Sequence, residues 1–168
     1  MRQRRPPRSD GTAAAAPLVP AKVQAVRMLA RREYSRAEIA QRLQQRGVSR
    51  DDVERALDEL QAAGYLSDAR YAQAVVTQKA GRYGKRAIAH ALREKGIAAP
   101  EALAALAPLA AADEFTDAQA LWQRRFGTAP ANERDKARQV RFLLSRGYGL
   151  SVALRVLRAA GASPFDDA

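Results

Sequence analysis

The sequence predicts an all-α protein built from three tandem three-helix repeats that form an elongated, curved array. Apolar residues recur at helical spacing from residue 21 onward, and no stretch alternates apolar and polar residues as a half-buried strand would. Three glycines recur 49 and 51 residues apart (96 − 47 and 147 − 96), each at the end of a predicted helix: Gly47, Gly96 and Gly147. A period of about fifty residues with three helices is typical of a helical repeat protein.

The residues around these glycines repeat as well. A leucine stands four residues before each glycine and another stands ten residues after it, and an apolar residue follows each glycine directly. These positions are Leu43, Leu92 and Leu143, then Leu57, Leu106 and Leu157, then Val48, Ile97 and Tyr148. Because each unit alone would leave an apolar face in water, we expect neighbouring units to stack into an extended body with a long face.

The pattern divides the chain into five segments: a flexible basic tail at 1–20, repeats at 21–66, 67–112 and 113–162, and a short tail at 163–168. The first tail carries four arginines among proline, serine, glycine and alanine, so it buries too little side-chain area to offset its ordering entropy. It is either a solvated leader, which we favour, or a basic arm that contacts phosphates.

The first repeat begins with a helix marked by Val23, Val26 and Leu29. A second helix opens at a capping box formed by Ser35 and Glu38, and a third opens in the same way at Ser49 and Asp52, before Gly64 ends it. The apolar residues of these two helices are Ile39, Leu43, Val53, Leu57 and Leu60.

The second repeat contains two helices separated by Gly81 and Gly84. The first has Ser67 or Asp68 as its N-cap and an apolar face that includes Tyr71. The second runs from Gly84 to Gly96 with Ile88 and Leu92 on its buried side, and a third starts at Pro100 with Leu103, Leu106 and Leu109.

The third repeat follows a predicted linker at residues 110–116. Its first helix carries Leu121, Trp122 and Phe126, and its second begins near Asn132. The apolar residues of the second helix are Val140, Leu143 and Leu144, and a last helix covers residues 152–160.

Composition indicates a soluble, cytoplasmic protein with a polyanionic partner. The formal net charge is +11, which points to nucleic acid or an acidic protein surface. The chain has no cysteine, so disulfides and thiolate metal sites are excluded, and no apolar run approaches the roughly 20 residues that a membrane helix needs. We expect a monomer, because a repeat array needs no second copy to close its core.

The positive charge is concentrated in the middle of the chain. A count of Lys and Arg against Asp and Glu gives +5 for residues 67–97, compared with +2 for 21–66 and −2 for 98–131. Any single cation is best explained as a solvating residue, but the clusters together predict contacts with a polyanion. The candidate contact residues are Arg70, Lys79, Arg82, Tyr83, Lys85, Arg86, Arg93, Lys95, Arg138, Arg141 and Arg146.

No constellation of residues indicates an enzyme, a metal site or a cofactor. The single histidine, His90, has no second histidine or cysteine to share a metal with. Asp51 and Asp52 stand at a helix start, where acids bond amide groups, and Gly81 and Gly84 lack the strand-to-helix context of a phosphate loop. We therefore predict no catalytic residue and no metal ligand.

The run from Tyr65 to Ala72, followed by Gly84, Ile88, Leu92 and Lys95-Gly96-Ile97, resembles the central motif of the RecX family, regulators of the RecA recombinase. The resemblance extends from about residue 23 to 160. Tyr71 stands where the family more often has Phe, and Ala87 where an Arg is usual. The resemblance implies a protein that binds RecA and its filament on single-stranded DNA. It also implies inhibition or modulation of RecA ATPase, strand exchange and coprotease activities in DNA repair, recombination and the SOS response.

The alternative is a free-standing helical DNA-binding protein or transcription regulator, because three-helix units with a short turn are similar to helix-turn-helix domains. The third helices of the repeats differ in charge, which argues against one shared recognition helix. Arg50 and Arg55 lie in the first and Arg155 and Arg158 in the last, whereas residues 101–109 contain no cation. Direct contact with single- or double-stranded DNA stays open at this point.

Overall fold

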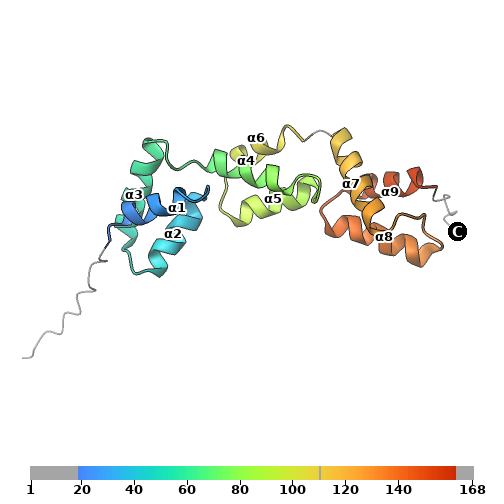
Figure 1. Ribbon diagram of the computed structural model, residues 1–168, viewed down its shortest axis with the longest axis horizontal. Helices are drawn as coiled ribbons and strands as arrows, with labels where there is room; N and C mark the ends of the chain where they lie inside the picture. Colours follow the sequence, from blue (N-terminus) through green and yellow to red (C-terminus); the bar gives the residue numbers. More distant parts are fainter. Residues whose placement is uncertain (1–18, 110, 162–168) are drawn as a thin grey trace, which may run out of the picture.

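The structure is a computed structural model that describes residues 19–109 and 111–161. Within these ranges it contains nine α-helices and no strand, which confirms the all-α prediction. The helices group in threes in chain order, and the three groups lie in a row along an arc (Figure 1). Most of the predicted tail at 1–20 and all of the one at 163–168 lie outside the described residues.

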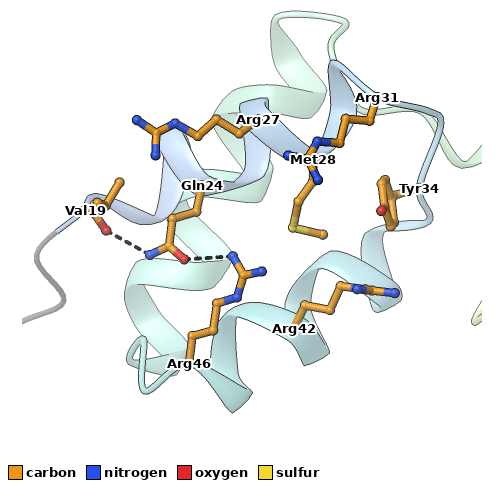
Figure 2. Close-up of a pocket in the computed structure, with 8 residues that line it drawn as sticks. All are labelled: Val19, Gln24, Arg27, Met28, Arg31, Tyr34, Arg42 and Arg46. Atoms are coloured by element: carbon orange, nitrogen blue, oxygen red, sulfur yellow. Dashed lines mark hydrogen bonds between the residues drawn. The ribbon is translucent and has the colours of Figure 1, made fainter.

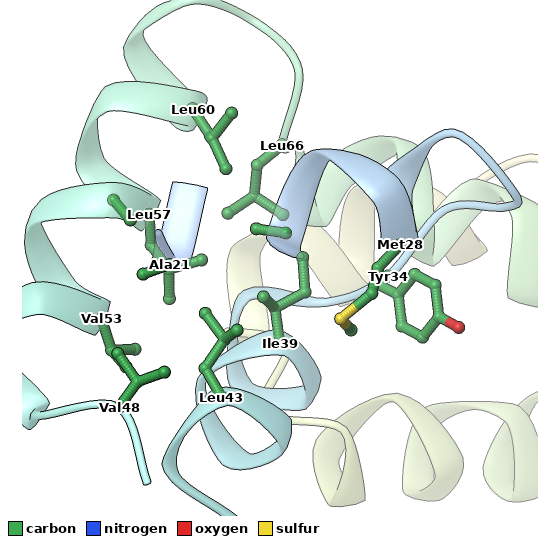
Figure 3. Close-up of a cluster of buried hydrophobic side chains, with 12 residues drawn as sticks. Ala21, Met28, Tyr34, Ile39, Leu43, Val48, Val53, Leu57, Leu60 and Leu66 are labelled. Atoms are coloured by element: carbon green, nitrogen blue, oxygen red, sulfur yellow. The ribbon is translucent and has the colours of Figure 1, made fainter. Parts of the chain in front are cut away.

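The first unit consists of α1 (Ala21–Leu29), α2 (Arg36–Gln45) and α3 (Arg50–Ala62). Both predicted caps are confirmed: the Ser35 hydroxyl accepts a hydrogen bond from the Glu38 amide, and the Ser49 hydroxyl accepts one from the Asp52 amide. The core between the helices includes the predicted leucines, which are fully buried (Figure 3).

The buried face of α1 differs from the one that its valines suggest. Val23 and Val26 are 41% and 40% exposed, whereas Ala21, Ala25 and Met28 are buried. These three residues are spaced four and three apart, so they share one face of the helix. The small alanines allow close packing against the rest of the unit, and the valines remain on the solvent side.

The second unit consists of α4 (Asp68–Lys79), α5 (Lys85–Glu94) and α6 (Ala99–Leu106). Ser67 is the N-cap of α4, and Tyr71, Ile88 and Leu92 are buried as predicted. Leu103 is 69% exposed, contrary to its expected place on the apolar side of α6. The buried face of α6 passes through Ala102 and Ala105, and residue 103 lies about 100° around the helix from residue 102.

The third unit consists of α7 (Ala111–Arg125), α8 (Glu133–Ser145) and α9 (Leu150–Ala159). The predicted linker at 110–116 is wrong, because α7 already begins at Ala111. This segment contains neither glycine nor proline and is rich in helix-forming alanine. The predicted helix start near Asn132 is confirmed, with Asn132 as the N-cap of α8, and Trp122 lies in the core, where its ring N–H donates to Gln139 Oε1 over 2.7 Å.

The middle helices of the three units meet end to end. At the first junction, the Ser35 hydroxyl at the start of α2 donates to the Lys95 carbonyl at the end of α5 over 2.8 Å. At the second junction, the Gly84 amide at the start of α5 donates to the Arg146 carbonyl at the end of α8 over 2.9 Å. Each pair joins the positive end of one helix dipole to the negative end of another.

Carboxylates from the first helix of the following unit complete both junctions. The Arg36 amide donates to Asp68 Oδ1 over 2.7 Å at the first junction. At the second, the Lys85 amide donates to Glu114 Oε1 over 3.3 Å and the Gly81 amide to Asp117 Oδ2 over 3.1 Å. The first amides of α2 and α5, which lack an intrahelical partner, and the Gly81 amide in the turn after α4 are therefore satisfied by the neighbouring unit, which fixes how consecutive units are oriented.

Candidate polyanion interface

The second junction gathers candidate contact residues from two units. Lys79 ends α4, Arg82 and Tyr83 lie in the following turn, Lys85 and Arg86 begin α5, and Arg146 caps the end of α8. We call these six residues the junction cluster. The Tyr83 ring joins its two halves, because Lys79 Nζ lies 4.8 Å and Arg146 Cζ 5.6 Å from the ring centroid. End-to-end helix packing thus brings cations 67 positions apart (146 − 79) to one ring.

Tyr83 is half-buried and packs against the core of the second unit. Its ring is engaged by two cations, an arrangement in which the electron-rich face of the aromatic ring stabilises positive charge. In the structure Tyr83 contacts two of the five cations of the junction cluster, Lys79 and Arg146. Its contact with a partner stays a prediction.

The cations of the junction cluster are not neutralised by acids. Among the residues that the structure describes, none of the five cations forms a salt bridge. The nearby carboxylates of Glu114 and Asp117 bond backbone amides instead. Arg93, on the same helix as Lys85, is also exposed and lacks an acid partner in the described chain. These side chains are free to bind an external anion.

Arg70 and Lys95 have partners at the first junction. Arg70 Nε lies 2.8 Å from Glu33 Oε1, and Lys95 Nζ lies 3.1 Å from Glu38 Oε1. The Glu38 side chain is only 12% exposed and also lies 3.7 Å from Arg32. Burial alone would raise the pKa of Glu38, but its bond to Lys95, the charges of Lys95 and Arg32, and the Ser35 amide outweigh burial and lower it. Both cations help to join the first two units.

Arg138 and Arg141 lie within α8, before its C-cap Arg146 at the second junction. Arg138 pairs with Asp135 over 2.6 Å, whereas Arg141 is exposed and has no acid partner among the described residues. Both line an open hollow of about 510 Å³ together with Asn132 and Arg134. The eleven predicted residues thus occupy three places: the first junction, the second junction with α5, and the face of α8.

Within residues 19–109 and 111–161, no group of three or more His, Asp or Glu side chains is arranged to hold a metal ion. His90 is exposed on α5, with Nε2 3.6 Å from Glu94 Oε1. None of the helices in the described part of the chain is both long and apolar enough to span a membrane.

Three family models match the chain in order: the first three-helix domain of RecX at residues 21–60, the second at 67–106 and the third at 112–157. Together they cover well over half of the sequence. The chain belongs to the RecX family. Its end-to-end units are therefore the three RecX domains.

Relatives and solved structures agree with this assignment. The chain is 43% identical to "Regulatory protein RecX" of Leptothrix cholodnii over 144 residues, which is 86% of this chain and 91% of that one. It is 38% identical to the Ralstonia nicotianae protein of the same name, over 84% and 88% of the two chains. The crystal structure of RecX from Lactobacillus salivarius has the same fold, with a TM-score of 0.73 at 18% identity over 84% of this chain and 94% of that chain.

One basic site in the first RecX domain escaped the sequence analysis. Four arginines, Arg27, Arg31, Arg42 and Arg46, line a hollow between α1 and α2. The domain carries a net charge of only +2, so a charge count by segment did not reveal them. The available signal was the spacing of four residues within each pair, which in a helix places two side chains on one face, although Arg31 itself lies in the turn after α1.

Proposed function

We propose that this chain regulates the RecA recombinase in the cytoplasm by binding the RecA filament on single-stranded DNA. In this role it restrains ATP hydrolysis, strand exchange and coprotease activity. The observation that carries the proposal is membership of the RecX family along all three domains, with relatives named as regulatory proteins. Family membership suggests regulation through binding, without chemistry at this chain's own residues.

The shape of the molecule supports a binding mode that spans several protomers. Three units in a row, joined at two bonded junctions, present a longer face than any single three-helix unit (Figure 1). An array of this kind suits a repeating partner such as a filament. In the proposed mechanism it bridges successive RecA protomers and holds them in a state that is unfavourable for filament growth or nucleotide turnover.

The junction cluster and Arg93 are the proposed contact with acidic RecA surface or with the DNA that the filament carries. Their side chains have no acid partner in the described chain, so binding an anion does not require an existing ion pair to break. Charge complementarity of this kind accelerates association and makes it sensitive to salt.

Sedimentation with preformed RecA filaments tests this assignment. We expect Lys85→Glu, Arg86→Glu and Arg93→Glu together to weaken co-sedimentation at least about tenfold, with a larger loss at low salt. The matched control reverses three exposed cations elsewhere: Arg50→Glu, Arg125→Glu and Arg158→Glu. Equal affinity of the first variant and the wild type across a salt series would refute the assignment. Tight, sequence-selective binding to DNA without RecA would favour the free-standing DNA-binding protein.

A further inference from the structure

The arginine hollow of the first unit is defined by Arg27, Arg31, Arg42 and Arg46 around a space of about 470 Å³. Arg27 and Arg31 stand on the α1 side and Arg42 and Arg46 on the α2 side, with Met28 between them (Figure 2). Arg42 on α2 and its C-cap Arg46 are about 6 Å apart along the helix axis, whereas Arg27 lies on α1 and Arg31 in the turn that follows it. The hollow therefore has two short rows of positive charge that face each other.

Among the residues that the structure describes, no acid lines this hollow. Its other lining residues are Val19, Gln24, Met28 and Tyr34, and none of the four arginines forms a salt bridge among the described residues. Arg46 Nη1 donates a hydrogen bond to Gln24 Oε1 over 3.2 Å. Most other cations of the unit are paired: Arg36, for example, lies 2.6 Å from Glu54 and 2.7 Å from Asp58.

The lining fits an anion rather than a base or an apolar side chain. Met28 and Tyr34 are only 8% and 9% exposed. The Tyr34 ring is contacted by Arg32, whose Cζ lies 3.6 Å from the centroid, and by Arg42 at 5.4 Å, and both guanidinium groups compete with a base for stacking on it. What the hollow offers is a set of planar guanidinium groups, which bind phosphate or carboxylate oxygens.

Two observations favour phosphates of a nucleic-acid strand over an acidic peptide. A peptide brings amide groups that need partners, whereas the polar uncharged groups here are already engaged: Gln24 donates to the Val19 carbonyl over 2.9 Å and accepts from Arg46. A strand presents regularly spaced charges that suit two rows of cations. The chain's own residues 1–18 carry four arginines and one aspartate, so their charge does not complement the hollow.

We infer that the arginine hollow binds the phosphate backbone of a nucleic-acid strand without reading its bases. Arg31 and Arg42 reach the strand from opposite sides, Arg27 adds a third charge, and Arg46 is preorganised by Gln24. This site is separate from the junction cluster and needs no RecA. The first domain thereby acts as a nucleic-acid anchor at one end of the array.

Fluorescence anisotropy with labelled oligo(dT) and the full chain, without RecA, tests the inference over a salt series. Each phosphate contact with a single strand contributes about 0.7 to the slope of log K against log salt. Arg31→Gln with Arg42→Gln should therefore make the slope shallower by about 1.4. The control, Arg50→Gln with Arg158→Gln, removes the same charge from exposed positions outside the hollow and should change the slope by less than half as much.

A charge-preserving variant, Arg31→Lys with Arg42→Lys, should keep the wild-type slope, and thermal unfolding should show all variants folded. Equal slope changes in the hollow variant and the control would overturn the inference, as would absence of oligo(dT) binding by the wild type. A third contrary result is that the hollow variant loses more affinity for labelled poly-glutamate than for oligo(dT). This result would assign the hollow to an acidic protein. None of these outcomes depends on a RecA effect.

Discussion

Gly147 shows how one residue joins two units. Its φ of +85° lies in the left-handed region, and a Cβ built on it would overlap Ala87 of the second unit. Gly47 occupies the equivalent repeat position with a φ of +83°, yet nothing lies within 4 Å of where its Cβ would be. The two glycines thus share a backbone constraint, but of this pair only Gly147 is in close contact with a neighbouring unit.

We predict that Gly147→Ala destabilises the protein more than Gly47→Ala. Both changes cost about 1 kcal/mol for a left-handed alanine. Gly147→Ala adds a steric cost of about 1–3 kcal/mol at the second junction. Denaturant unfolding followed by circular dichroism measures both variants, and equal losses would show that the junction is not close-packed at this glycine.

Glu38 makes the stability of the first junction depend on pH. Its pKa is lowered in the folded protein, so its contribution to stability is present above the unfolded pKa, near 4.5, and is lost as pH falls through the folded pKa. We predict that Glu38→Gln lowers the free energy of unfolding at pH 7 by about 1–2 kcal/mol. The difference between wild type and variant should shrink as pH falls below 4.5, which thermal unfolding over pH 7 to 3 measures. A constant difference across this range would contradict the assigned role.

At the scale of elements, Ser35 serves both its own helix and the neighbouring unit. Its hydroxyl accepts the Glu38 amide at the start of α2 and donates to the Lys95 carbonyl at the end of α5. Ser49 caps α3 in the same way but is exposed, with its hydroxyl bonded to Asp52 of the same helix. A comparison of the two serines therefore distinguishes the stability that a cap contributes from the stability that the junction bond contributes.

We predict that Ser35→Ala costs about 2 kcal/mol and Ser49→Ala about 1 kcal/mol, because both lose a cap and only the first leaves a neighbouring carbonyl without its bond. Chemical unfolding of the two variants provides the comparison. If the two losses were the same, the bond from Ser35 to Lys95 would contribute nothing to the coupling of units.

The sequence was most informative where one local rule decides the structure. Ser35, Ser49 and Ser67 act as caps as predicted, α8 begins next to Asn132 as predicted, and the leucines around the repeat glycines are buried. The errors have physical causes. In α1 and α6 there are more apolar residues than one buried face can hold, and tertiary packing determines which of them are buried. The first four residues of α7, at 111–114, include no large apolar residue that would mark the start of a helix.

The candidate site depends on contacts that no local pattern contains. The composition indicated which cations were available, but not that Arg70 and Lys95 meet Glu33 and Glu38 across a junction. The arginine hollow escaped for a related reason: five of the unit's seven acids lie on α3, so they cancel the arginines of α1 and α2 in a charge count without lying beside them.

At the scale of the whole molecule, the bonded junctions make one extended body of three units. A compact domain of 168 residues would have a radius of gyration of about 15 Å, and an unfolded chain of this length about 43 Å. We predict an intermediate value with an asymmetric distance distribution. Small-angle X-ray scattering measures both, and a radius of gyration near 15 Å would mean that the units fold back on one another.

The central claim is that this RecX-family array restrains RecA on single-stranded DNA. The most direct measurement is the rate of single-stranded-DNA-dependent ATP hydrolysis by the cognate RecA, titrated with the full chain. We expect inhibition at concentrations well below that of RecA, and a weaker effect for the variant with Lys85, Arg86 and Arg93 reversed to glutamate. An unchanged rate up to one chain per RecA protomer would contradict the claim.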